Sequence, residues 1–163
     1  MFQQWDKLNL VYTISDIETF WSVFNNMQRP SQIVSNNYAV FRHDIDMKWE
    51  APENRNGGRW LFTIEPQWTV LGKDGTKRFL MDTVWESLLI LALSGKYDTA
   101  VEQLYGLVTT CRPSGCRIHI WTGSSDPKVL EAQQKWISSF CQLPKDCIVQ
   151  FKKHTDNTDV KTC

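Results

Sequence analysis

The chain has 163 residues, of which 42% are apolar and 12% aromatic, enough for one domain with a sizeable core, and we expect a single domain over residues 1–163. Its 18 basic and 18 acidic residues balance, which excludes a protein that coats nucleic acid through general positive charge. Any phosphate binding must therefore come from a few basic residues at one place and not from the overall charge of the protein. Eight tryptophans exceed the needs of packing and favour a recognition function.

The absence of targeting signals and the pattern of cysteines exclude further classes of protein. No apolar run approaches a membrane span, and the N-terminal ten residues lack the charged start and apolar block of a signal peptide. We expect a soluble cytoplasmic protein with no membrane partner, and a nuclear location stays open. The five cysteines are odd in number and form no C-x-x-C motif, which predicts reduced thiols rather than a disulfide framework or a zinc site. They are Cys111, Cys116, Cys141, Cys147 and Cys163.

The first elements are a short strand and a helix. Residues 8–12 are β-prone, and a capping box then predicts that a helix begins at Ser15, because Glu18 follows three residues later. Apolar side chains recur at helical spacing and form an arc too wide for one buried stripe. They are Ile17, Phe20, Trp21, Val23, Phe24 and Met27. An exposed tryptophan in this arc would indicate a partner site.

Two strands and a long helix come next. Residues 38–43 and 59–70 are expected to be paired strands around a loop, and residues 73–75 to form a turn. Residues 78–93 are expected to form a helix that packs on the sheet through Leu80, Val84, Leu88 and Leu91. Its other side then presents Trp85 and Glu86, either as a recognition patch or as ordinary surface residues.

The C-terminal third predicts a hairpin, a helix and a strand. Residues 104–112 and 116–123 flank a turn, which places Arg112 and Arg117 on either side of it. In the second strand Ile118 and Ile120 share one face, and Arg117, His119 and Trp121 share the other. Asp126 followed by Pro127 predicts a helix start, and residues 147–154 a last strand.

Residues 47–60 carry the most specific chemistry. Pro, Asn and Gly dominate residues 51–58, so Trp49 and Glu50 belong to a loop at the edge of a sheet. An indole face attracts a flat, preferably cationic ring, and an adjacent carboxylate accepts hydrogen bonds from a ring edge with two donors. Guanine methylated at N7 meets both requirements. The alternative is that Trp49 packs on the core rim and Glu50 is solvated.

The sequence indicates neither a catalytic group nor a metal site or cofactor. The three histidines, His43, His119 and His154, are scattered, and no nucleophile with a neighbouring base is recognisable. We therefore expect a binding protein and not an enzyme.

Four motifs in a fixed order resemble one family. They are D-I-E-T-F-W at residues 16–21, M-K-W-E at 47–50, N-G-G-R-W at 56–60 and I-H-I-W at 118–121. The chain resembles the eukaryotic translation initiation factor 4E family, whose members bind the 7-methylguanosine cap of messenger RNA. The resemblance extends from Trp5 to about Lys161. The family's usual first strand, with its His-Pro-Leu segment, is expected to be missing.

The resemblance implies an α+β fold in which a curved antiparallel β-sheet is backed by three α-helices on its convex face and holds the cap on its concave face. It implies that Trp5 and Trp49 sandwich the methylated base and that Glu50 reads the guanine edge. It also implies that Trp121 contacts the N7 methyl. The residues implied to hold the cap phosphates are Arg112, Arg117 and Lys161.

The family also docks a helical Tyr-x-x-x-x-Leu-Φ motif of scaffold and inhibitory proteins on its convex side. The matching residues here are Ile17, Trp21, Trp85, Glu86 and Leu89. Two alternatives stay open: a cap-binding translational repressor, and a truncated interaction module with impaired cap binding. The presence of both Trp5 and Trp49 favours the initiation factor, because repressors of this kind often replace one of these tryptophans.

Overall fold

The computed structural model describes residues 10–33, 35–94 and 103–155 of the chain, so Trp5, Cys163 and Lys161 lie outside the described residues. The elements are α1 (Ile17–Asn26), η2 (Pro30–Gln32), β1 (Asn37–Phe41), β2 (Gly58–Ile64), β3 (Thr69–Leu71), β4 (Lys77–Phe79), α2 (Leu80–Ser94), β5 (Leu104–Arg112), β6 (Gly115–Thr122), α3 (Pro127–Phe140) and β7 (Gln150–Lys153).

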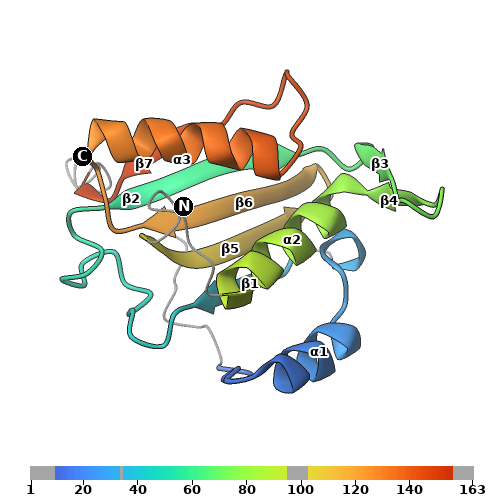
Figure 1. Cartoon of the computed structure of the whole chain (residues 1–163), viewed down its shortest axis with the longest axis horizontal. Helices are drawn as coiled ribbons and strands as arrows, with labels where there is room; N and C mark the ends of the chain where they lie inside the picture. The colour runs from blue at the N-terminus through green and yellow to red at the C-terminus, as the bar shows by residue number, and fades with distance from the viewer. Residues whose placement is uncertain (1–9, 34, 95–102, 156–163) are drawn as a thin grey trace.

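Five strands form one antiparallel sheet in the order β1-β5-β6-β2-β7, and β3 and β4 form a separate hairpin. Figure 1 shows α2 and α3 across one face of the sheet, with α1 beyond α2. The predicted α+β fold, a curved antiparallel sheet backed by three helices, is confirmed. None of the described helices has the length and apolarity needed to cross a membrane.

The predicted pairing of the strands on either side of the loop is wrong. β1 pairs with β5 and β2 pairs with β6, so the whole β5–β6 hairpin lies between them. The hairpin closes through a tight local turn, whereas residues 42–57 are long enough to reach around it. The predicted second strand is also interrupted at residues 65–68, where Pro66 has no N–H for a sheet ladder, and β3 follows as part of the outer hairpin.

Side chains alternate between two faces of the sheet. Phe62, Ile118 and Ile120 are fully buried against the helices, in the hydrophobic core. The opposite face carries Arg117, His119 and Trp121 on β6, as the alternation predicted, together with the residues paired with them on β5 and β2. We call it the open face because it is the side away from α2 and α3; its central residues His119, Trp121 and Val108 are nevertheless buried.

The N-terminal segment differs from its prediction in two ways. Residues 10–15 form no strand, and the α1 cap is Asp16 rather than Ser15. The Thr19 N–H donates to Asp16 Oδ1 at 2.7 Å, and the Ser15 hydroxyl donates to the other oxygen at 2.9 Å. A carboxylate accepts on both oxygens, so Asp16 outcompetes the hydroxyl beside it.

The predicted exposure of Trp85 is also wrong. Trp85 is 1% exposed and Leu89 4%, as buried as the predicted core residues Val84 and Leu88. Helix α2 contacts η2 as well as the sheet, so two faces of α2 are buried instead of one. The indole of Trp85 stacks on the Tyr38 ring at 6.5 Å between centroids.

Helix α3 begins where it was predicted to begin. Asp126 accepts from the Lys128 and Val129 N–H groups, and Pro127 is the first helical residue. The buried Gln133 accepts from the Trp60 indole N–H at 2.9 Å and donates to the Thr122 hydroxyl at 3.0 Å. This side chain therefore joins α3 to β2 and β6.

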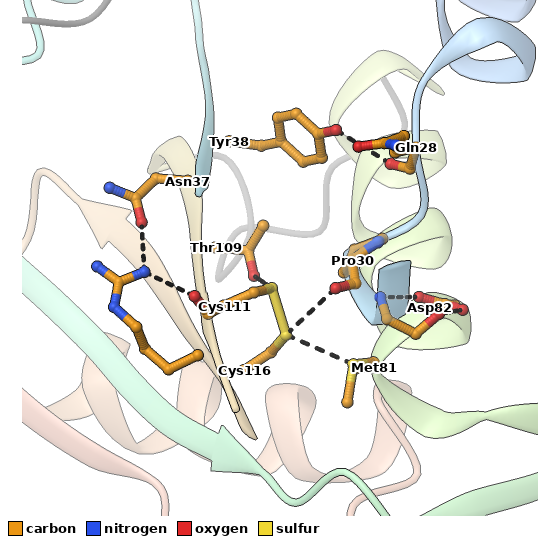
Figure 2. The surroundings of a disulfide bond; sticks show 11 residues. Gln28, Pro30, Asn37, Tyr38, Met81, Asp82, Thr109, Cys111 and Cys116 are labelled. Atoms are coloured by element: carbon orange, nitrogen blue, oxygen red, sulfur yellow. Dashed lines mark hydrogen bonds between the residues drawn. A yellow bond between two sulfur atoms is a disulfide. The ribbon is translucent and has the colours of Figure 1, made fainter. Parts of the chain in front are cut away.

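The prediction that the cysteines are reduced thiols is wrong for one pair. Cys111 and Cys116 form a disulfide across the β5–β6 hairpin, whereas Cys141 and Cys147 are free thiols. The register places the bonded cysteines directly opposite each other, with Cα atoms 4.2 Å apart. Figure 2 shows the disulfide facing the helix side, where the Cys116 sulfur lies 3.4 Å from Met81 Sδ.

Candidate functional site

The loop that carries Trp49 and Glu50 is fixed by its own hydrogen bonds. Asn54 is fully buried, and its amide donates to the carbonyl oxygens of Asp46 at 2.6 Å and Lys48 at 2.8 Å. The Ala51 N–H also donates to the Lys48 carbonyl, at 3.1 Å. These bonds close the turn in which Trp49 and Glu50 lie, so a loop without regular structure presents both side chains in a defined position.

Two glycines bring this loop against the sheet. An added Cβ on Gly57 would collide with the Thr122 carbonyl oxygen, and one on Gly58 would collide with the Lys152 carbonyl oxygen. Only glycine permits this close approach. The His154 N–H donates to the Gly57 carbonyl at 3.2 Å. The loop, the end of β6 and the end of β7 therefore meet at one place.

A recess of about 280 Å³ lies at this meeting point. Its lining consists of Trp49, Glu50, Arg55, His154 and Thr155. Trp49 is half-buried and Glu50 is exposed, as a ligand-contacting indole and carboxylate need to be. The structure thus brings together the two residues that the sequence singled out in this loop.

Trp121 contacts one of the residues that line the recess. It is only 1% exposed, and its ring is 4.4 Å from the His154 ring and 5.2 Å from the Phe41 ring. The predicted N7-methyl indole therefore contacts His154, which lines the recess, but is not itself among the lining residues. Sequence reasoning did not assign His154 to the site, because only the contact between β7 and the loop brings it there.

His154 is neutral at physiological pH. Its side chain is 1% exposed, and burial, with the nearby Arg59 charge, lowers its pKa to about 4 against an opposing contribution from the Gly58 backbone. A neutral imidazole next to the recess does not repel a cationic ligand there.

Arg112 and Arg117 are exposed at the hairpin end of the sheet. Arg112 donates to the Asn37 side-chain oxygen at 3.4 Å and to the Cys111 carbonyl at 2.6 Å. Arg117 lies opposite Thr110 on β5. The alternation of the strands puts both arginines on the open face, the same face that the recess adjoins.

The predicted partner surface divides into an exposed and a buried part. Ile17 is 61% and Trp21 38% exposed on α1, whereas Trp85 and Leu89 lie beneath the surface. The Glu86 carboxylate accepts from Arg29 at 3.2 Å. The exposed part therefore consists of an aromatic and an aliphatic side chain on α1, with an ion pair on the neighbouring helix.

Fold and site together define an α+β protein with an aromatic and acidic recess and with arginines at the hairpin end of its sheet. The family model described as Eukaryotic initiation factor 4E matches residues 2–162, and the chain belongs to this family.

Known relatives agree with this assignment. Eukaryotic translation initiation factor 4E-1 of Caenorhabditis elegans is 34% identical over 118 residues, which cover 72% of this chain and 52% of that protein. The chain thus spans about half the length of this relative.

Two solved structures share the fold. The complex of C. elegans eIF4E-3 with the 4E-binding protein Mextli has a TM-score of 0.80 and 25% identity, over 99% of this chain and 89% of that one. The structure of Ascaris suum eIF4E-3 with the m2,2,7G cap has a TM-score of 0.76 and 26% identity, over 91% and 79%.

Proposed function

We propose that this chain binds the 7-methylguanosine cap of messenger RNA and acts in the cytoplasm as a translation initiation factor that recruits a scaffold protein. The observation that carries the proposal is the recess with Trp49 and Glu50 at its wall in a chain of the initiation factor 4E family. The proposal treats residues 1–163 as one cap-binding domain without catalytic activity. The cap-bound structure of the Ascaris relative supports it.

The methylated base fits the recess for electrostatic reasons. Methylation at N7 makes guanine a cation, which the Trp49 ring attracts by about 0.5 to 2 kcal/mol. The Glu50 carboxylate accepts from the N1 and N2 donors of guanine, and a hydrogen bond to a charged group contributes about 1.5 to 3 kcal/mol. Trp5 is proposed as the second indole of the sandwich, from the family resemblance. Trp121, whose ring contacts His154 at the recess, is proposed as the indole near the N7 methyl, from the family resemblance.

The cap phosphates are proposed to leave the recess along the open face. Arg112 and Arg117, exposed at the hairpin end, then bind them through charge-assisted hydrogen bonds. Lys161 is proposed as a further phosphate contact from the resemblance alone.

The scaffold and inhibitory proteins are proposed to dock a Tyr-x-x-x-x-Leu-Φ helix on α1 and α2. Ile17 and Trp21 supply exposed apolar contacts, and Glu86 supplies a charge that sets the register of the helix. Trp85 and Leu89 support this surface from below. The structural likeness to a relative bound to a 4E-binding protein agrees with such a surface.

Calorimetric titration with 7-methyl-GTP tests the base site through two matched pairs of variants. Glu50→Gln is expected to lower the affinity at least ten-fold, since it removes the charge that accepts from guanine. Glu53→Gln, in the same loop but outside the recess, should leave the affinity unchanged. Trp49→Ala should abolish useful binding, whereas Trp136→Ala, on α3, should change stability alone. Full affinity of the Glu50→Gln protein would remove Glu50 from the site.

A further inference from the structure

The two charged side chains of the recess do not pair with each other. Of the described residues that line it, only Glu50 and Arg55 carry a charge, since His154 is neutral at physiological pH. Both charged side chains are exposed, and no ion pair among the described residues includes either of them. The recess therefore offers one carboxylate and one guanidinium to a ligand.

The backbone around Arg55 is fixed by hydrogen bonds within the loop. The N–H groups of Asn54 and Arg55 both donate to the Ala51 carbonyl at 3.0 Å, and the Gly57 N–H donates to the Asn54 carbonyl at 2.9 Å. The loop thus holds the backbone of Arg55 at the recess while its side chain remains exposed. A ligand that binds this guanidinium does not have to order the loop first.

This pair of charges suits a ligand that is cationic at one end and anionic at the other. A base methylated at N7 is attracted by Glu50 and repelled by Arg55, so the charges of the recess favour a nucleoside only weakly. A phosphate on the same nucleoside is attracted by Arg55. A guanidinium binds phosphate through two parallel N–H···O bonds, which add directional preference to the charge attraction.

The arginines at the hairpin end are better placed for the outer phosphates than for the one next to the base. Trp121 contacts His154 at the recess, and Arg117 precedes Trp121 by four residues on β6, or about 14 Å. Arg112, which is paired with Gly115 at the turn, lies farther still. Only one ribose separates the first phosphate from the base, so this phosphate stays close to the recess.

We infer that Arg55 binds the phosphate next to the methylated base, while Arg112 and Arg117 bind the outer phosphates. The inference rests on the proposed cap-binding function and adds to it a division of the phosphate chain between the loop and the sheet. The observation that carries it is the unpaired guanidinium of Arg55 in the recess that Trp49 and Glu50 also line. Binding makes and breaks no covalent bond.

Calorimetric titrations with 7-methylguanosine, 7-methyl-GMP and 7-methyl-GTP measure each step along the phosphate chain. In the wild-type protein the first phosphate should increase the affinity roughly ten-fold, as expected of a charge-assisted hydrogen bond. Arg55→Gln should abolish this increase and leave the affinity for 7-methylguanosine unchanged or up to about three-fold higher, because a repulsion of the base is removed. Arg55→Lys keeps the charge without the planar fork and should retain part of the increase.

Two matched variants control for general electrostatic effects. Lys48→Gln removes one positive charge from the same loop, but Lys48 is paired with Asp46 and does not line the recess. It should leave the increase from 7-methylguanosine to 7-methyl-GMP within about two-fold of the wild-type value. Arg117→Gln should lower the further increase from 7-methyl-GMP to 7-methyl-GTP and leave the first step intact.

The outcomes separate this inference from the proposed function. An undiminished first step in the Arg55→Gln protein would overturn the inference, as would an equal loss of affinity for the nucleoside and for both nucleotides. A loss of the same size in the Lys48→Gln protein would also overturn it, because the effect would then come from the general charge of the loop. If GMP and 7-methyl-GMP bind equally well and both depend on Arg55, the phosphate contact stands and cap recognition fails.

Discussion

Acid should destabilise this protein through its two buried histidines, His119 and His154. The folded-state pKa values of His119 and His154 are each about 4, whereas the ordinary value is 6.5. Well above pH 6.5 both histidines are neutral in the folded and unfolded chains, so there neither affects the pH dependence of stability. Between pH 6.5 and 4 only the unfolded chain binds the protons, so the free energy of unfolding falls with falling pH.

The magnitude follows from these values. From pH 7.5 to 5.0 each histidine lowers the free energy of unfolding by about 2 kcal/mol, or about 4 kcal/mol for both. Both side chains are more than nine-tenths buried, so solvent screening takes little from this figure. A small domain is stable by only about 5 to 15 kcal/mol, so the loss is large.

Urea unfolding at a series of pH values measures this slope. The His119→Gln protein should lose only about half as much stability as the wild type between pH 7.5 and 5.0. The exposed His43→Gln variant should lose as much as the wild type. A wild-type protein that is equally stable at both pH values, or a His119→Gln protein with an undiminished slope, would refute the reasoning.

Three other perturbations have defined outcomes. Reduction of the Cys111–Cys116 disulfide should lower the free energy of unfolding by about 2 kcal/mol, as expected for so short a loop; an unchanged urea midpoint would contradict this. Gln133→Leu removes the acceptor of the buried Trp60 indole N–H and should destabilise by about 1 to 3 kcal/mol in the same assay; its exposed neighbour variant Gln134→Leu should destabilise by less than about 0.5 kcal/mol. Trp21→Ala should weaken binding of a Tyr-x-x-x-x-Leu-Φ peptide in calorimetry and leave 7-methyl-GTP affinity within about two-fold; equal peptide binding would remove Trp21 from the docking surface.

Local patterns predicted the elements well. The β5–β6 hairpin, the α3 start at Asp126 and the alternation along β6 all depend on residues a few positions apart, and the structure confirms each. The α1 cap shifted from Ser15 to Asp16, because two acceptors compete at neighbouring positions and the sequence pattern does not rank them.

Features that depend on contacts between distant parts of the chain were not predicted from the sequence. The burial of Trp85 depends on η2 covering a second stripe of α2, and no periodicity within α2 reveals such a neighbour. The disulfide follows from the hairpin register, which places Cys111 opposite Cys116, although the spacing alone matches no familiar motif.

The candidate site likewise contains residues that local sequence patterns predicted and residues that only the folded chain brings in. Trp49 and Glu50 were predicted from a loop composition and a side-chain pair that are adjacent in sequence, and both line the recess. His154 comes from the other end of the chain, and His119 stands out only once the charges of neighbouring strands are known. The surroundings of both histidines therefore depend on tertiary structure and could not be predicted from local sequence.

The measurement that most directly tests cap binding is the affinity of the whole chain for 7-methyl-GTP against GTP, followed by tryptophan fluorescence. The methyl group adds a positive charge to the base, and two indole contacts of about 1 to 2 kcal/mol each predict that 7-methyl-GTP binds roughly thirty- to a thousand-fold more tightly. Equal affinity for the two nucleotides would contradict cap recognition by this recess.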